Sequence, residues 1–195
     1  MEEVFDLYTK YGNKGYIGEN VTQYEHAVQC ALLGEQHINK VVTDTISKRN
    51  FILGCFFHDV GHLMEHDKEL YETYKCEKMG ELGIQSHEKK GAQYLRDLNI
   101  PEDICLLVEN HINVKRYLVS MNSEYYDNLS DASKETFKYQ GGKMTEREIV
   151  DFQQDNLYIY HLMLRKFDDA AKSTEPTLIA NIANYDYINY FKKLI

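Results

Sequence analysis

The amino-acid sequence predicts an all-α fold, arranged as a single compact helical bundle. Apolar residues recur at intervals of three and four in several stretches, which is the spacing of one face of a helix. Helix-capping side chains precede many of these stretches, and no long alternating pattern typical of strands competes with them. Only two prolines, Pro101 and Pro176, interrupt the 195 residues, and no linker or internal repeat is visible. We therefore expect one domain over residues 1–195, long enough to bury a sizeable core.

The first predicted helix begins at Thr22. Thr22 and Glu25 form a capping-box pattern, in which each side chain pairs with the backbone of the other residue, and His26 follows in the first turn. A second helix is expected from about Thr43 to His58, where apolar residues fall at helical spacing. We expect Gly61 to end it soon afterwards, because glycine readily adopts the left-handed conformation that terminates helices.

Two further helices each carry a histidine. Ser86 is expected to cap a helix from His87 to Leu98. Pro101 is expected to begin the next one, which carries His111, because proline is tolerated in the first turn of a helix. Both helices should present their histidine toward the interior.

The last third of the chain also reads as helical. Ser130 and Thr145 are predicted N-caps, and a long helix is expected over Asp155–Ala171. The tail, at about residues 176–193, is rich in tyrosine and is predicted as an amphipathic helix. We expect this helix to close the bundle by core or dimer packing.

Charge and composition exclude several classes of function. The net charge of −9 leaves no basic stripe for a phosphate backbone, which argues against nucleic acid as a partner. The acidic start, Met1–Glu3, does not resemble a secretion signal, and the apolar run Phe51–Phe57 is far shorter than the roughly 20 residues of a membrane helix. We therefore expect a cytoplasmic protein that binds small molecules rather than nucleic acid or membrane.

The cysteines agree with a reducing compartment. They lack the paired spacing of metal sites and are mostly flanked by apolar residues, so we expect reduced thiols. These residues are Cys30, Cys55, Cys76 and Cys105. Neither composition nor pattern distinguishes a monomer from a homodimer.

His58 and Asp59 are the most informative pair of residues. They follow directly on the apolar run Phe51–Phe57, so a histidine and a carboxylate lie at the end of a buried helix. Burying an unpaired carboxylate is costly, and a bound cation removes that cost. An ordinary helix end with a histidine near its negative pole is the simpler alternative.

Three more histidines and a late aspartate extend this pair to a possible ligand set. Imidazole suits iron, zinc, copper and nickel, and a carboxylate is able to bridge two ions, so such a set is sufficient for a dinuclear centre. Successive helical residues diverge by about 100°, so His58 and Asp59 are able to face different sides of a metal pair, with the carboxylate as the bridge. The candidate metal ligands are His26, His58, Asp59, His87, His111 and Asp168.

The order and spacing of these residues resemble the HD-domain superfamily, in which a first histidine, a His-Asp pair and a late aspartate bind metal. Further blocks are similar to one group within it, the mixed-valent di-iron oxygenases, and most of all to its organophosphonate-degrading members; myo-inositol oxygenase is a more distant relative. The blocks are Tyr16–Glu19, Gln23–His26, His58–His62, His111 with Lys115–Ser120, Asn128–Ser133 and Tyr139–Gly142. The similarity covers most of residues 14–172.

The resemblance implies a single HD domain, with a metal-binding core at about residues 16–172 and a closing helix at about 176–193. It also implies two iron ions in the mixed-valent Fe(II)/Fe(III) state and O₂ as co-substrate; ligand type alone does not select iron over zinc. The implied reaction is O₂-dependent cleavage of the C–P bond of a 1-hydroxyphosphonate. The expected substrate is 2-amino-1-hydroxyethylphosphonate, which would give glycine and phosphate.

Three residues are expected to hold the phosphonate. Lys115 lies four residues after His111, and Arg165 lies three before Asp168, so each cation shares a helix face with a candidate ligand. Ser133 falls in the first turn of a predicted helix, where backbone N–H groups and the helix dipole favour an anion. The simpler alternatives are two surface cations and a serine that only caps its helix.

Tyr16 and Glu19 lie in a segment flanked by Gly15 and Gly18, whose backbone freedom suits a loop that closes over substrate. The resemblance implies that Tyr16 occupies the second iron when substrate is absent and that Glu19 meets the substrate ammonium. It also implies that His62 faces the substrate. Without the resemblance, these three would be ordinary loop residues.

Two other classes of function remain open. HD domains are commonly metal-dependent phosphohydrolases, in which the same ligands would activate water against a phosphate ester. A metal-stabilised sensor or binding module is the non-enzymatic alternative. Residues 37–50 and 63–83 match the related oxygenases least well, so an N-methylated or other hydroxyphosphonate is an alternative substrate.

Overall fold

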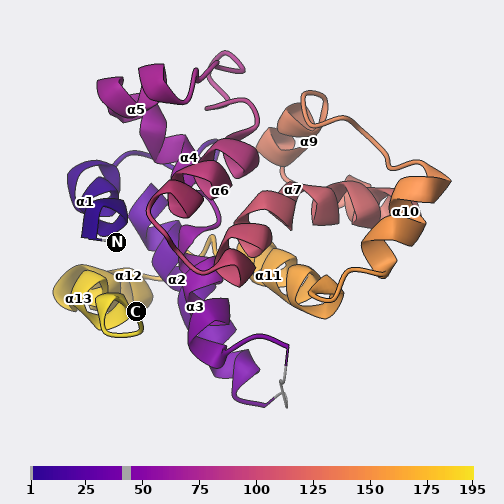
Figure 1. Ribbon diagram of the computed structural model, residues 1–195. Coiled ribbons are helices and arrows are strands. Elements are labelled where there is room, and N and C mark those ends of the chain that lie inside the picture. The colour runs from indigo at the N-terminus through magenta and orange to yellow at the C-terminus, as the bar shows by residue number, and fades with distance from the viewer. Residues whose placement is uncertain (1, 41–44) are drawn as a thin grey trace.

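Helices dominate the computed structural model, which describes residues 2–40 and 45–195 (Figure 1). In these ranges the only strand-like pairings are two isolated bridges, between Gly15 and Thr22 and between Lys78 and Ile84. The predicted all-α class is therefore confirmed. Thr43, the predicted start of the second helix, lies outside the described residues.

Five helices pack against one another to form the body of the protein. They are α2 (Gln23–Ile38), α3 (Lys48–Phe57), α6 (His87–Asp97), α7 (Glu102–Met121) and α11 (Tyr158–Ala170). Helix α3 packs against α2, α7 and α11, while α6 packs on α7. Every candidate metal ligand belongs to one of these helices or to the residues directly after α3.

Shorter elements cover this body. The N-terminal α1 packs against the C-terminal α13 on one side, and α9 and α10 lie on the opposite side (Figure 1). These elements are α1 (Glu2–Tyr11), α4 (Val60–Leu63), the 3₁₀ turn η1 (Met64–His66), α5 (Lys68–Thr73), α8 (Ser123–Asp127), α9 (Asp131–Phe137), α10 (Glu146–Gln153), α12 (Pro176–Asn184) and α13 (Tyr187–Lys192).

Several helix starts agree with their local sequence signals. Thr22 and Glu25 form the predicted capping box at α2, with the Thr22 hydroxyl accepting from the Glu25 N–H at 3.1 Å and the Glu25 carboxylate accepting from the Thr22 N–H at 2.7 Å. Thr145 caps α10 in the same way, and the Ser130 hydroxyl caps α9. Each cap satisfies backbone N–H groups that have no partner within the helix.

Other boundaries differ from the predictions. Helix α3 begins at Lys48 because the Ser47 hydroxyl accepts from the Asn50 N–H and caps it there. Helix α11 begins at Tyr158 rather than Asp155, because the Asp155 carboxylate accepts from the Leu157 N–H and holds a turn before the helix. These local hydrogen bonds compete with helical ones.

The predicted roles of Gly61 as a helix terminator and of the Ser86 side chain as a helix cap were wrong. Gly61 does not end a helix but lies inside α4, which follows α3 almost directly. Ser86 does precede α6, but its backbone is left-handed, with φ 56°, and its side chain makes no capping hydrogen bond. The predicted closing helix is also two helices, since Asp186 caps a new one, α13, after α12 has ended.

Aromatic rings fill much of the core between the chain ends and α3. Phe56 packs 4.7 Å from Phe191 and Phe57 packs 5.2 Å from Phe5, measured between ring centroids. All four rings are essentially inaccessible to solvent. The tail therefore packs on the core, as predicted.

The structure also bears on the cysteines and on membrane spanning. All four cysteines are buried and free. Among the described residues, no helix combines the length and apolar character needed to cross a bilayer.

Candidate metal centre and substrate cavity

Asp59 lies between two pairs of histidines. Its Oδ1 atom is 3.3 Å from Nε2 of His87 and 3.3 Å from Nε2 of His111. Its Oδ2 atom is 3.3 Å from Nε2 of His58 and 3.6 Å from Nε2 of His26. Each carboxylate oxygen therefore faces a different pair of imidazoles, which is the arrangement of a bridging ligand.

Asp168 completes the group around the first histidine pair. Its Oδ1 atom lies 3.4 Å from Nε2 of His26 and 3.7 Å from Nε2 of His58. Ligand atoms about 2.1 Å from one metal ion and at right angles lie about 3.0 Å apart, so these separations suit a shared ion. The candidate ligands are all at least 94% buried, so solvent does not compensate their charges.

The tautomers of the histidines provide an independent test of a metal. Nδ1 of His26 donates to the carbonyl of Ala171 at 2.9 Å, and Nδ1 of His58 donates to that of Cys55 at 2.8 Å. The proton of each neutral ring is therefore on Nδ1, and the lone pair is on Nε2. Yet the two Nε2 atoms face each other at 3.0 Å. A cation between the rings satisfies both lone pairs, so the donor set fits a metal ion.

The second histidine pair is arranged in the same way. The Nε2 atoms of His87 and His111 are also 3.0 Å apart, and Nδ1 of His111 donates to the carbonyl of Val108 at 2.7 Å. Nδ1 of His87 has no hydrogen-bond partner among the described residues, although a carboxylate oxygen of Glu88 lies 3.8 Å away. The two pairs, with Asp59 between them, offer ligands for two ions.

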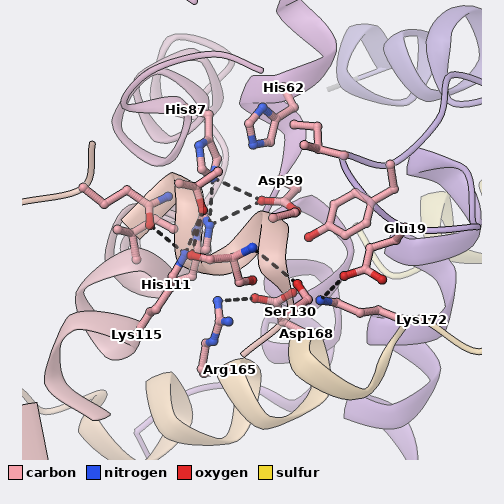
Figure 2. A pocket seen from close by; sticks show the side chains of 17 residues that line it. Glu19, Asp59, His62, His87, His111, Lys115, Ser130, Arg165, Asp168 and Lys172 are labelled. Carbon is pink, nitrogen blue, oxygen red and sulfur yellow. Dashed lines mark hydrogen bonds and ion pairs between the residues drawn. The ribbon is translucent and has the colours of Figure 1, made fainter. Parts of the chain in front are cut away.

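A small cavity of about 50 Å³ adjoins this cluster (Figure 2). Its wall includes four of the candidate ligands, Asp59, His87, His111 and Asp168. It also includes every residue that the sequence analysis assigned to substrate or catalysis: Tyr16, Glu19, His62, Lys115, Ser133 and Arg165. The structure thus brings both predicted sets together, from segments more than 140 residues apart.

Lys115 is a buried cation with a free donor. Its ammonium donates to the hydroxyl of Thr136 at 2.9 Å and to the amide oxygen of Gln140 at 2.8 Å. Since a lysine has three N–H donors, one remains for a ligand. Burial, together with the nearby charge of Arg165, lowers the pKa of Lys115 to about 7.

Arg165 is held by three partners. Its guanidinium donates to the hydroxyl of Tyr125 at 2.8 Å, to Asp168 at 2.8 Å and to Asp169. Two of its five N–H groups therefore remain, which is the number needed for a bidentate contact with an anion. Burial opposes its charge, but Asp168 and Asp169 outweigh burial and raise its pKa above the ordinary value. The contact also fixes the orientation of the Asp168 carboxylate.

His62 differs from the candidate ligands in its hydrogen bonding. Its Nδ1 accepts from the N–H of Ile84 at 3.2 Å, and its ring stacks on His87 at 3.8 Å between centroids. Burial and the adjacent His87 lower the pKa of His62, which favours the neutral ring. Nε2 of that neutral ring carries the proton, so His62 offers a donor rather than a lone pair. This geometry suits a group that faces substrate.

Ser133 lies at the cavity wall, in the first turn of α9. Its backbone N–H donates to the hydroxyl of Ser130 and is therefore occupied by the helix cap. The Ser133 hydroxyl is the group that remains for a ligand, and the expected contact of Ser133 with the phosphonate stays a prediction.

The glycine-flanked loop covers the cluster. The ring of Tyr16 stacks on the imidazole of His26 at 3.9 Å between centroids, with 13° between the planes. Burial, the charge of Asp59 and a hydrogen bond to it raise the pKa of Tyr16 well above the ordinary value. Glu19 accepts from the ammonium of Lys172 at 2.8 Å, just beyond the end of α11 (Figure 2).

Sequence reasoning missed the residues that support this cavity. Lys172 follows Asp168 by four residues, the interval that drew attention to Lys115 after His111, but it lies beyond the end of α11, where that interval no longer fixes direction. Three partners of Lys115 and Arg165 carry no such signal, because they come from α8, α9 and the turn after α9: Tyr125, Thr136 and Gln140. A fourth partner, Asp169, lies four residues after Arg165 on α11.

Comparison with known proteins agrees with the fold and the cluster. The sequence model of the HD domain matches residues 24–157, which include five of the six candidate ligands. The chain therefore belongs to the HD-domain family.

Proteins with similar sequences indicate which members of the HD-domain family this chain resembles. The chain is 35% identical over 180 residues to hydroxymethylphosphonate dioxygenase of Gimesia maris, a match that covers 88% of this chain and 78% of the relative. It is 29% identical over 175 residues to [1-hydroxy-2-(trimethylamino)ethyl]phosphonate dioxygenase (glycine-betaine-forming) of Leisingera caerulea, covering 90% and 81%. An uncharacterized protein of Acanthamoeba polyphaga mimivirus, L432, is 37% identical over 172 residues, covering 88% and 72%. Within the HD-domain family, the chain is thus similar to phosphonate dioxygenases, as its sequence blocks indicated.

Proposed function

We propose that this protein cleaves the C–P bond of a small 1-hydroxyphosphonate with O₂, at a mixed-valent pair of iron ions. The main support for the proposal is the position of Asp59. Its two carboxylate oxygens face separate histidine pairs, beside a cavity lined by buried cations. The two relatives named as phosphonate dioxygenases support the reaction type.

In this proposal the six clustered side chains divide between two ions. His26, His58 and Asp168 would hold one ion, His87 and His111 would hold the other, and Asp59 would contribute one oxygen to each. When bound, the iron pair supplies the redox chemistry that reduces O₂. The backbone carbonyls that accept from the histidines fix the rings and make the ligands more basic.

The cations at the cavity wall bind the phosphonate. Arg165 offers two N–H groups and Lys115 offers one, while the Ser133 hydroxyl adds a further donor. Nε2–H of His62 donates to a substrate oxygen. These contacts would hold C1 and its hydroxyl beside the candidate metal ligands, and Tyr16, which lines the cavity and stacks on His26, would limit the access of water.

The overall reaction is balanced with one O₂. The C–P bond breaks, C1 is oxidised from an alcohol to a carboxylate, and phosphorus leaves as phosphate. One oxygen atom of the stoichiometry enters each product. Hydroxymethylphosphonate would give formate, and 2-amino-1-hydroxyethylphosphonate, the substrate expected from the sequence blocks, would give glycine.

These candidate substrates differ in the group attached to C1. Hydroxymethylphosphonate has only hydrogen there, whereas the amino and trimethylamino compounds carry a cation. In our proposal this group points toward Glu19, the carboxylate in the covering loop. The preference of the enzyme among these substrates therefore depends on the partner that the Glu19 carboxylate has in the absence of substrate.

The proposal is tested with protein loaded with ferrous iron and a panel of these hydroxyphosphonates. We expect O₂ uptake and phosphate release in equal amounts for at least one of them, and loss of both in His58→Ala. Phosphate release from a phosphate ester without O₂, and none from the panel, would instead support the phosphohydrolase alternative. Metal-dependent binding without turnover of either class would support a sensor.

A further inference from the structure

An ion pair between Glu19 and Lys172 forms part of the wall of the cavity. The Lys172 ammonium lies 2.8 Å from the Glu19 carboxylate, and both side chains are about four-fifths buried, with 20% and 18% exposed. The pair joins the covering loop to the segment after α11, which are 153 residues apart in the chain.

The same pair is shared by a second, outer cavity. This cavity has a volume of about 380 Å³, and its other lining residues are Tyr125, Asn128, Leu129, Ser130 and Asp169. Because Glu19, Lys172 and Ser130 line both cavities, the ion pair stands between the inner cavity and the outer one. If the substituent on C1 points toward Glu19, as in the proposed function, a hydrogen there leaves the pair intact, whereas a longer substituent meets it.

Charge adds to this steric effect. A substrate ammonium gains from Glu19 only if it replaces the ammonium of Lys172 or shares the carboxylate with it. Replacement exchanges one charge-assisted hydrogen bond for another, so the net gain is small, while sharing brings two cations together. A neutral substituent avoids both costs.

We propose that Lys172 is a specificity-determining residue, which competes with a substrate ammonium for Glu19. This inference rests on the proposed function. It assigns hydroxymethylphosphonate as the preferred substrate of the native chain, and it makes the amino and trimethylamino compounds substrates that become better when Lys172 is removed.

The test compares Lys172→Met with the native chain. Methionine keeps much of the side-chain length and removes the charge. We expect the ratio of kcat/KM for 2-amino-1-hydroxyethylphosphonate to that for hydroxymethylphosphonate to rise roughly tenfold, since Glu19 is then free to bind the substrate ammonium. The matched control is Lys166→Met, which makes the same change at an exposed site on α11 that lines neither cavity.

A double variant isolates the competition itself. In Glu19→Gln with Lys172→Met, the carboxylate is absent, so the gain for the amino compound should disappear. Dissociation constants of both phosphonates, measured by calorimetry without O₂, should show the same effect. Binding of the amino compound relative to hydroxymethylphosphonate should tighten in Lys172→Met and not in the double variant, so the test does not depend on turnover. An unchanged ratio in Lys172→Met, or equal losses for both compounds, would overturn the role of Lys172. Failure of the native chain to cleave any of the three hydroxyphosphonates would overturn the proposed function instead.

Discussion

Gly61 lies directly against the backbone carbonyl of His87: a methyl group on Gly61 would lie 2.1 Å from that oxygen. The two residues belong to α4 and α6, which pack closely side by side. Glycine is required here by close approach rather than by a turn, and this approach sets the distance between His87 and Asp59.

Gly61→Ala should therefore disturb the second metal site. The added methyl group must push α6 away from α4, at a cost of about 1–3 kcal/mol in unfolding free energy. We expect bound iron to fall from two ions per chain toward one, because His87 moves while His26 and His58 do not. Metal analysis and urea unfolding measure the two effects. Gly15→Ala, at a site with open space around the glycine, is the control. Full iron content in Gly61→Ala would contradict this reading.

Arg165→Lys should weaken phosphonate binding although it keeps the charge. A single ammonium cannot bind Tyr125, Asp168 and Asp169 and still present a fork to the substrate. We expect kcat/KM to fall by roughly 10- to 100-fold, mainly through KM. Arg116→Lys serves as the control, since Arg116 pairs with Glu148 outside the cavity. An unaltered KM in Arg165→Lys would remove Arg165 from the anion site.

Lys115 predicts a pH dependence of substrate binding. Its pKa is lowered to about 7 by burial and by Arg165, while Asp59, Asp168 and Asp169 act in the opposite direction. Lys115 is thus charged below pH 7 and loses its charge as the pH rises, so KM should increase above pH 7, by at most a factor of ten per pH unit. The pH profile of kcat/KM measures this change.

Lys115→Arg provides the comparison for that profile. Arginine stays protonated throughout the range, so the fall above pH 7 should flatten. A native profile that stays level to pH 9, or an identical fall in the arginine variant, would show that another group titrates.

His161 predicts a separate effect on stability. It is 99% buried, stacks on Phe152 and lies 3.5 Å from Asp155. Burial lowers its pKa below the ordinary 6.5, although Asp155 acts in the opposite direction. The folded state then binds fewer protons than the unfolded state. The contribution of neutral His161 to the free energy of unfolding is therefore fully present above pH 6.5 and is lost as the pH falls below that value.

His161→Phe keeps an aromatic ring at this position and removes the group that takes up the proton. The free energy of unfolding, measured by urea between pH 7.5 and pH 5, should fall less in the variant than in the native chain. Equal losses would show that His161 does not contribute to acid sensitivity.

Local and global features were not equally predictable from sequence. The caps at Thr22 and Thr145 depend on residues three apart, so their pattern was sufficient. The convergence of the candidate ligands was expected from the resemblance to the HD-domain superfamily, whereas the position of Lys115 beside His111 followed from helix faces, since i and i+4 residues point the same way. Gly61 was misassigned because its partner, His87, belongs to another helix and no local pattern records that contact.

The support of the cavity was less predictable for a related reason. Thr136 and Gln140 bind Lys115 only because α9 and the turn after it fold over α7. Lys172 lies beyond the end of α11, where the helical interval no longer fixes direction. Such residues are identified by the packing of distant segments, which the sequence does not specify by spacing.

The central claim is that Asp59 bridges two iron ions, and Mössbauer spectroscopy of iron-57-loaded protein tests it most directly. We predict two iron ions per chain that are magnetically coupled in the mixed-valent state, with coupling and O₂-dependent phosphonate cleavage both lost in Asp59→Asn. One iron per chain, or two uncoupled ions in a native protein that remains active, would contradict the account.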